Sequence, residues 1–248
     1  MLSVSHLFKS FNSGTALEVN AVSDIDFNLP EASFTLLLGS NGSGKSTLLN
    51  LISGILLPDK GRIELNGKTI QHLPEHKRSA FISRIFQDPA TGTSPDLSLI
   101  ENFRIAALRR KQKGLRIGLT SSFKKKIEEK LSTLEMQLES RMNQPMRNFS
   151  GGQRQAMALL MATLDPPDLL LLDEPVAALD PRTAEVVRTL IAKITAEQKI
   201  TALMVTHDLK HCLALGDKII QMQNGKIIRS ISGPEKQNLT LPEIYSWF

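Results

Sequence analysis

Residues 34–53 read FTLLLGSNGSGKSTLLNLIS, and the rest of the fold can be built outward from them. The first five residues are an apolar run, which is typical of a strand buried on both faces of a parallel sheet. A turn rich in glycine and serine follows, and residues 46–53 then have the composition of an apolar helix. Residues 39–46 match the pattern G-x-x-x-x-G-K-[ST] in the strand–loop–helix context that this pattern requires. The segment therefore predicts a site for a nucleoside triphosphate.

Each part of this loop has a chemical reason. The glycines let the backbone curl so that successive N–H groups converge on phosphate oxygens, and the following helix adds the partial positive charge of its N-terminus. Lys45 is expected to reach the β- and γ-phosphates, and the Ser46 hydroxyl is expected to ligate Mg²⁺. The candidate phosphate-binding residues of the loop are Gly39, Ser40, Asn41, Gly42, Ser43, Gly44, Lys45 and Ser46.

Two acidic residues follow another apolar run. Residues 169–172 are four leucines, which predict a buried strand, and Asp173 and Glu174 come directly after them. Ligands of open parallel sheets bind beyond the carboxyl ends of the strands. We therefore expect Asp173 to hold the magnesium shell and Glu174 to take a proton from an attacking water. Seen alone, the two acids could simply cap the next helix.

A second anion site is predicted at Phe149–Gln153, where a serine and two glycines open a long helical run. The chain has only one lysine-bearing loop, so we interpret the two sites as lying on different faces. Two copies arranged head to tail would then complete each other's pocket. The alternative is an ordinary helix N-cap.

The composition is that of a globular protein: 248 residues, 41% hydrophobic and 22% charged. It excludes a disordered tail and a collagen-like rod. The only cysteine is Cys212, which excludes a disulfide scaffold and favours a reducing compartment. No apolar run approaches the ~18 residues that span a bilayer. The first residues lack the pattern of a secretory signal. We therefore expect a cytoplasmic location.

The remaining segments alternate between strand and helix patterns. Strands are predicted at 2–7, 25–29, 62–65, 201–205 and 218–222, and a helix at 183–195. Asn66-Gly67 and Asn224-Gly225 are typical hairpin turns. Residues from about 98 to 164 have helical spacing and dense charge. This order predicts an α/β fold with a helical insertion.

The net charge of +5 is concentrated in one segment. Residues 102–127 contain no acidic residue and these basic ones: Arg104, Arg109, Arg110, Lys111, Lys113, Arg116, Lys124, Lys125 and Lys126. A solvated helix face, an anionic membrane surface and an acidic partner each fit this pattern. Nucleic acid is not expected, because aromatic residues do not alternate with the charges as base stacking requires.

Together these motifs resemble the nucleotide-binding subunits of ABC transporters, over nearly the whole chain. Six elements occur in the order of that family: residues 39–46, Gln87, residues 149–153, Asp173-Glu174, Ala178-Leu179-Asp180, and His207 within residues 205–208. The resemblance implies a P-loop NTPase (RecA-like) core with an N-terminal antiparallel β-subdomain and an inserted α-helical subdomain, forming one ATP-binding domain over 1–248. The core and β-subdomain are expected at about 1–89 and 165–248, and the helical subdomain at about 90–164.

The resemblance also implies ATP and Mg²⁺ as cofactors, and a role for each motif. Thr47 joins Lys45 and Ser46 in holding phosphates and metal. Gln87 contacts the metal and the lytic water. Glu174 acts as general base, and His207 fixes the γ-phosphate.

Other implied roles concern the dimer and the base. Ser150, Gly151, Gly152 and Gln153 contact the ATP of a second copy in a head-to-tail ATP-sandwich dimer, and Asp180 communicates across that interface. Phe11 matches the aromatic residue that stacks on adenine, with simple packing as its alternative. Phe149 and Ala177 depart from the family, which usually has leucine and serine there.

The detached ATPase resembles those of bacterial importers, so integral-membrane permease subunits are expected as partners. Residues 86–95 and 159–164 resemble a branch paired with a branched-chain-amino-acid-like permease and a solute-binding lipoprotein. The implied function is to power import of a small solute, such as an amino acid, from the inner face of the cell membrane. The alternative is a soluble ATPase of the iron–sulfur assembly type. Leu97, Leu99, Ile100 and Phe103 could form an apolar patch for a permease helix, or pack inward.

Overall fold

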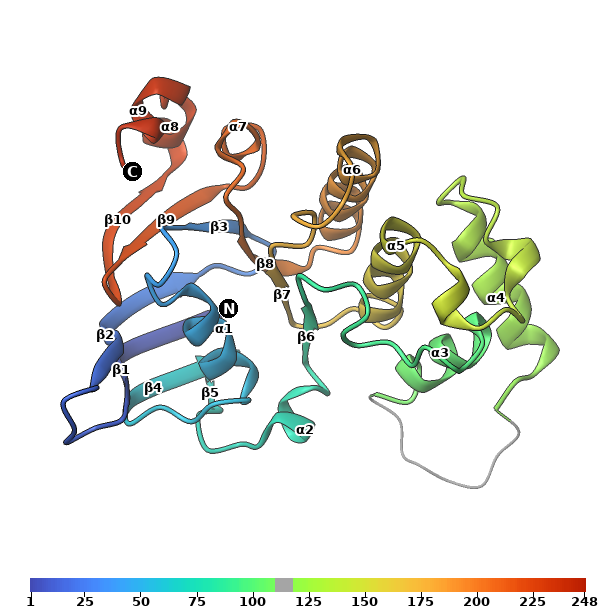
Figure 1. Cartoon of the computed structure of the whole chain (residues 1–248), viewed down its shortest axis with the longest axis horizontal. Coiled ribbons are helices and arrows are strands. Elements are labelled where there is room, and N and C mark those ends of the chain that lie inside the picture. Colours follow the sequence, from blue (N-terminus) through green and yellow to red (C-terminus); the bar gives the residue numbers. More distant parts are fainter. Residues whose placement is uncertain (110–117) are drawn as a thin grey trace. The chain divides into compact units, whose positions relative to one another are not determined.

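The computed structural model describes residues 1–109 and 118–248, which form two compact units. The first unit contains Met1–Arg84, Asp168–Glu174 and Thr195–Phe248, and the second contains Ile85–Pro167 and Pro175–Ile194. Strands dominate the first unit and helices the second (Figure 1). The predicted α/β class is therefore confirmed. Within the described residues, no helix is long and apolar enough to cross a membrane.

The first unit contains an antiparallel sheet with the strand order β2-β1-β4-β5. Its strands are β1 (Leu2–Phe11), β2 (Val19–Leu29), β4 (Lys60–Leu65) and β5 (Lys68–Thr69). The strands predicted near the N-terminus are present and longer than the sequence pattern indicated. The turn between β4 and β5 lies at Asn66-Gly67, and both residues have positive φ, as the predicted hairpin requires.

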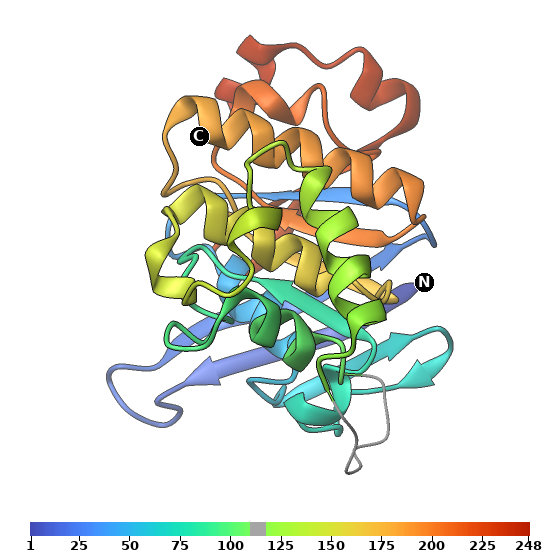
Figure 2. The same ribbon diagram turned by 90° about the vertical axis from the view of Figure 1, so that its right-hand side faces the viewer.

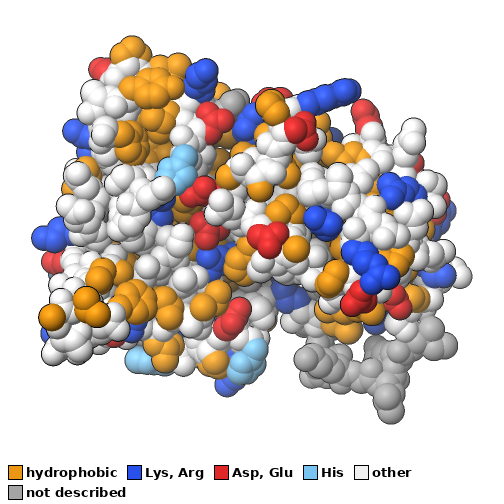
Figure 3. Space-filling view, in the orientation of Figure 1, with side chains coloured by type: hydrophobic (Ala, Val, Ile, Leu, Met, Phe, Trp, Pro, Cys, Tyr) orange, Lys and Arg blue, Asp and Glu red, His pale blue; other side chains and the backbone are white. Residues whose placement is uncertain are grey.

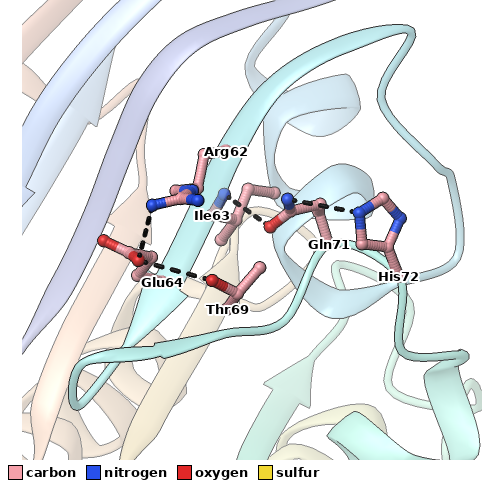
Figure 4. A network of polar contacts seen from close by, with 6 residues as sticks. All are labelled: Arg62, Ile63, Glu64, Thr69, Gln71 and His72. Atoms are coloured by element: carbon pink, nitrogen blue, oxygen red, sulfur yellow. Dashed lines mark hydrogen bonds and ion pairs between the residues drawn. The ribbon is translucent and has the colours of Figure 1, made fainter.

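A polar network anchors the chain that follows this hairpin (Figure 4). The backbone N–H of Ile63 donates to Oε1 of Gln71 at 3.1 Å, and Nε2 of Gln71 lies 3.5 Å from Nε2 of His72. On the hairpin itself, Glu64 Oε1 accepts from both Arg62 and Thr69. Gln71 is buried, so the bond from Ile63 satisfies a carbonyl that would otherwise be costly to bury.

The second sheet has the order β10-β9-β3-β8-β7-β6. Its strands are β3 (Phe34–Leu38), β6 (Ile82–Ile85), β7 (Leu169–Asp173), β8 (Thr201–Val205), β9 (Lys218–Gln223) and β10 (Lys226–Ser232). Neighbours from β9 through β3 and β8 to β7 are parallel, and β10 is antiparallel to β9. β3, β7 and β8 are almost entirely buried, as the apolar runs of β3 and β7 predicted; β8 had been predicted only as a strand. β6 had not been predicted.

Helix α1 (Lys45–Ser53) joins the cores of the two sheets, because its leucines and Ile52 belong to one buried cluster with residues of both. Its C-terminal end is held by Arg78 of the short helix α2 (Glu75–Arg78), which donates to the carbonyls of Leu51, Ile52, Gln71 and Leu73. Burial lowers the pKa of Arg78 to about 10. These four bonds replace the water that a buried guanidinium needs.

The second unit is built on α3 (Leu99–Ala106), α4 (Ser121–Ser132), α5 (Gly151–Ala162) and most of α6 (Pro181–Glu197), with 3₁₀ turns at Glu139–Arg141 and Met146–Asn148. Helix α3 packs against both α4 and α5 (Figure 2). It begins with a capping box in which Ser98 and Glu101 bond each other's backbone. The helical character predicted for residues 98–164 is thus present in the described part of the segment.

The interpretation of Leu97, Leu99, Ile100 and Phe103 as an exposed docking patch is wrong. Leu99, Ile100 and Phe103 are buried, and Leu97 is half-buried.

Of the basic residues predicted to form a surface, Arg110, Lys111, Lys113 and Arg116 lie outside the described residues. Arg109 donates to the carbonyls of Ala162 and Asp165, and Arg104 lies 5.4 Å from the centre of the Phe123 ring. Lys124, Lys125 and Lys126 are exposed on α4.

Replacing Leu99 by alanine tests this packing. We expect the free energy of unfolding to fall by roughly 2–5 kcal/mol, the usual cost of truncating a fully buried leucine. Ile105 lies on the same helix and is exposed, so Ile105→Ala should change stability by less than about 0.5 kcal/mol. Urea denaturation followed by circular dichroism measures both. Equal small losses would show that α3 is not packed as described.

Three short helices complete the first unit: α7 (Leu209–Cys212) before β9, and α8 (Gly233–Gln237) and α9 (Leu241–Tyr245) after β10. Hydrophobic side chains gather over α8 and α9 on the face drawn in Figure 3, and Tyr245 and Phe248 of this region are exposed. Trp247 is tied to the sheet because Gln221 donates to its carbonyl and the Arg229 guanidinium lies over its ring. The C-terminal segment is therefore anchored on β9 and β10.

Candidate nucleotide-binding site

The loop between β3 and α1 lies against the backbone of neighbouring strands. A Cβ at Gly39 would come within 2.3 Å of the carbonyl oxygen of Met222, and one at Gly44 within 2.2 Å of that of Ala21. Both glycines also have positive φ, 154° and 101°. Only glycine can occupy these two positions, so the loop's shape follows directly from its composition.

Lys45 lies under this loop. Its ammonium donates to the carbonyls of Gly39 at 2.8 Å and Ser40 at 2.9 Å. Burial lowers the pKa of Lys45, and the nearby carboxylates of Glu174 and Asp173 oppose that shift. The loop carbonyls thus hold the Lys45 ammonium at the start of α1. A phosphate bound there would also be stabilised by the dipole of the helix.

A cavity of about 530 Å³ opens over the loop, which lies in the size range of small-molecule sites. Its lining residues come from the end of β1, the start of β2, the loop, the end of β7 and the turn before β10. They are Phe11, Val19, Asn20, Ala21, Asn41, Gly42, Ser43, Gly44, Lys45, Ser46, Thr47, Glu174 and Asn224. Most of the predicted binding residues of the loop, with Phe11 and Glu174, therefore share one cavity.

Two polar residues meet at the carboxyl edge of the sheet. Glu174 directly follows β7 and His207 follows β8, and these strands are neighbours. Nε2 of His207 lies 2.7 Å from Oε1 of Glu174, and the Glu174 side chain is 18% exposed. The Glu174 backbone has φ of 47° and donates its N–H to the carbonyl of Val205. An uncommon backbone conformation thus directs the carboxylate to His207.

Asp173, the last residue of β7, forms an ion pair that the sequence did not reveal. Its Oδ2 accepts from Nη2 of Arg84 on β6 at 2.7 Å, and both side chains are largely buried. Arg84 also donates to Oδ1 of Asn50 on α1. The only sequence signal for this ion pair was one arginine within Ile82–Ile85. That short segment had not been predicted as a strand.

The residues here fit a magnesium ion by their chemistry. Mg²⁺ prefers hard oxygen ligands and is usually held by one or two protein groups together with substrate phosphates. Ser46 offers an exposed hydroxyl at the start of α1, and Asp173 offers a carboxylate at the end of β7. The ion pair with Arg84 and the nearby ammonium of Lys45 oppose a further cation at Asp173.

The Ser150–Gln153 segment lies in the second unit and begins α5. Ser150 is the N-cap: its Oγ accepts from the Gln153 N–H at 3.3 Å, while Gln153 Oε1 accepts from the Ser150 N–H at 3.1 Å. A Cβ at Gly152 would lie 1.9 Å from Cγ2 of Thr183 on α6. Ser150 thus caps α5, and Gly152 is required for packing against α6.

Two further predicted residues lie in this unit. Gln87 is exposed in the bend after β6, and the carbonyl of the preceding Phe86 accepts from the buried Gln155 of α5. Gln155 was not predicted as a functional residue. Its sequence signal is that it is a polar residue on the apolar, buried face of a helix. Asp180 precedes α6, and hydrogen bonds from Thr183 hold the pKa of Asp180 below its usual value.

A mostly parallel sheet, with a phosphate loop after one inner strand and acidic residues after another, defines a P-loop nucleoside triphosphatase. The family model described as ABC transporter matches residues 22–177, more than half of the chain. The chain therefore belongs to the ABC transporter family, as its motifs predicted, and is an ATP-hydrolysing subunit of that family.

Two relatives have transport names. The chain is 39% identical over 251 residues to the tyrosine transport ATP-binding protein of Clostridioides difficile (strain R20291), covering 100% of this chain and 98% of that protein. It is 36% identical over 224 residues to the sulfate/thiosulfate import ATP-binding protein CysA of Synechocystis sp., covering 90% of this chain and 58% of that protein. These relatives do not favour the iron–sulfur assembly alternative.

Solved structures agree with the fold. A dimeric ATP-binding cassette in a post-hydrolysis state bound to ADP and Pi is 26% identical, with a TM-score of 0.80 over 94% of this chain and 98% of that chain. A nucleotide-free ATP-binding cassette from an ABC transporter is also 26% identical, with a TM-score of 0.78 over 99% and 98%. The predicted P-loop NTPase fold is confirmed.

Proposed function

We propose that this chain binds Mg-ATP in the cavity over residues 39–47 and hydrolyses it with Glu174 as general base, so that two copies power import of a small solute. The observation that carries the proposal is the contact between Glu174 and His207, 2.7 Å, with Glu174 in the same cavity as the phosphate loop. General-base catalysis needs a proton acceptor in the cavity and a partner that orients it, and Glu174 with His207 meets both needs.

Each residue then has a task. The loop N–H groups, Lys45 and Thr47 bind the phosphates, while Phe11, which also lines the cavity, stacks on adenine. Ser46, Asp173 and Gln87 would hold Mg²⁺, which would supply positive charge to offset the charge of the phosphates. Glu174 takes a proton from the attacking water, and His207 holds the γ-phosphate.

The pocket is completed by a second copy. Gly151, Gly152 and Gln153 begin α5 after the exposed N-cap Ser150, and a helix N-terminus with a serine cap offers N–H groups to an anion. In a head-to-tail dimer this start faces the γ-phosphate bound to the partner, and Asp180 lies at the same interface. The dimeric cassette among the similar structures supports this arrangement.

The transport partners are membrane proteins. Because the family powers transport, the dimer acts on integral-membrane permease subunits at the cytoplasmic face of the membrane, and a solute-binding protein delivers the solute to them. The relative named for tyrosine transport spans nearly the same length as this chain, which favours an amino acid as the solute. Nucleic acid has no part in this function.

Uptake by reconstituted vesicles tests the function. We expect proteoliposomes that contain the cognate permease subunits, with this chain and ATP enclosed and the solute-binding protein outside, to accumulate labelled tyrosine above the level without ATP. Vesicles with Lys45→Ala should accumulate none, because the loop loses the cation that binds phosphate. ATP-dependent uptake of sulfate but not of tyrosine would contradict the amino-acid assignment, and ATP-independent uptake would contradict coupling.

A further inference from the structure

Arg84 is a cation placed on the carboxylate that the proposed function assigns to the metal. It reaches Oδ2 of Asp173 at 2.7 Å, and the Arg84 and Asp173 side chains are 9% and 14% exposed. A charge pair this well shielded interacts strongly, because little water screens it. Asp173 therefore cannot be treated as a free anionic ligand.

The guanidinium also spans two elements of the site. One nitrogen, Nη2, donates to Asp173 at the end of β7, and the other, Nη1, donates to Asn50 of α1, the helix that begins with Lys45. A planar fork can bind two acceptors in fixed directions, which the point charge of a lysine cannot do. Arg84 thus fixes the Asp173 carboxylate relative to the helix that carries the phosphate loop.

We propose that Arg84 is a positioning residue that orients Asp173 and partly neutralises it, so that the site takes up magnesium efficiently only together with ATP. This inference rests on the proposed Mg-ATP site. An ATP molecule brings its own negative charge and offsets the cations of Arg84 and Lys45. Before nucleotide binds, the Arg84 guanidinium supplies the positive charge that neutralises Asp173.

Magnesium dependence of nucleotide binding tests the inference. Binding of a fluorescent ATP analogue to the full chain is measured across Mg²⁺ concentrations, beginning in EDTA. We expect Arg84→Met to lower the half-saturating Mg²⁺ concentration about tenfold, because a like charge beside the metal ligand is removed. Without metal, the same variant should bind the analogue more weakly than the wild type.

Three further variants separate charge from structure. Arg84→Gln keeps an amide donor for Asp173 and loses the charge, so it should reproduce the shift even where Arg84→Met does not fold. Arg84→Lys keeps the charge but loses the fork that reaches both Asp173 and Asn50, so its half-saturating Mg²⁺ concentration should not fall as it does in Arg84→Met. Arg62→Met removes an exposed cation from the same unit and should change nothing.

The outcomes distinguish this inference from the function on which it rests. An unchanged or higher half-saturating Mg²⁺ concentration in Arg84→Gln, with wild-type folding by circular dichroism, would overturn the role of Arg84. A wild-type chain that binds no ATP analogue, or binds it without any response to Mg²⁺, would instead contradict the Mg-ATP site itself. A loss of melting temperature alone, with the same Mg²⁺ dependence, would mean that Arg84 is only structural.

Discussion

Replacing Glu174 by glutamine is expected to reduce steady-state ATP hydrolysis by about a thousandfold, while ATP binding is retained. General-base catalysis typically contributes about 10²–10⁴ in rate, and glutamine cannot accept the proton. The substitution keeps the side-chain shape and can preserve a hydrogen bond to His207, which now lies 2.7 Å from the carboxylate. ATP should therefore remain in the pocket, and an ATP-bound dimer should accumulate. Phosphate release measures the rate, and light scattering measures the dimer.

The matched control removes a carboxylate away from the cavity. Glu129 is exposed on α4, and Glu129→Gln should hydrolyse ATP at the wild-type rate. Hydrolysis by Glu174→Gln within about threefold of the wild type would rule out Glu174 as the base. Loss of ATP binding in this variant would show that the carboxylate maintains the pocket rather than the chemistry.

Replacing Ser150 by arginine is expected to reduce hydrolysis by about a hundredfold and to leave the nucleotide affinity of the monomer within about threefold. The serine caps α5, and in the proposed dimer it contacts the γ-phosphate held by the partner's loop. A bulky side chain at this point obstructs closure of the dimer. The monomer's own cavity is lined by residues of the first unit, so its affinity should not change.

A second N-cap provides the control for Ser150→Arg. Thr120 caps α4 through a bond from the Phe123 N–H, so Thr120→Arg loses a comparable cap, at a cost of about 1 kcal/mol in stability. Its hydrolysis should stay near the wild-type rate. If both variants lose hydrolysis equally, the effect of Ser150→Arg is one of helix stability and not of a composite pocket.

The phosphate loop and its strands could be predicted because their residue types are required by backbone packing and burial. Gly39 and Gly44 cannot carry a side chain against Met222 and Ala21, and the apolar runs of β3, β7 and β8 require burial on both faces. The phosphate loop could thus be located from composition and spacing alone.

Contacts that depend on tertiary packing were not predictable in the same way. β6 is only four residues long, and nothing in Ile82–Ile85 indicated that Arg84 would reach Asp173, 89 residues further on. The apolar spacing of Leu99, Ile100 and Phe103 fitted a docking patch and a core equally well. Only the positions of α4 and α5 against α3 decide between them, and no local pattern contains that information.

The most direct test of the composite ATP site is a mixing experiment in the Glu174→Gln background. One chain also carries Lys45→Ala and cannot bind phosphate, and the other also carries Ser150→Arg and cannot complete its partner's pocket. In a head-to-tail heterodimer, the loop of the Ser150→Arg chain faces the intact Ser150 of the Lys45→Ala chain, which restores one site. The measurement is the amount of labelled ATP retained per dimer after gel filtration. We expect almost none with either chain alone and one ATP per heterodimer in the mixture; a mixture that retains no more than the separate chains would contradict the account.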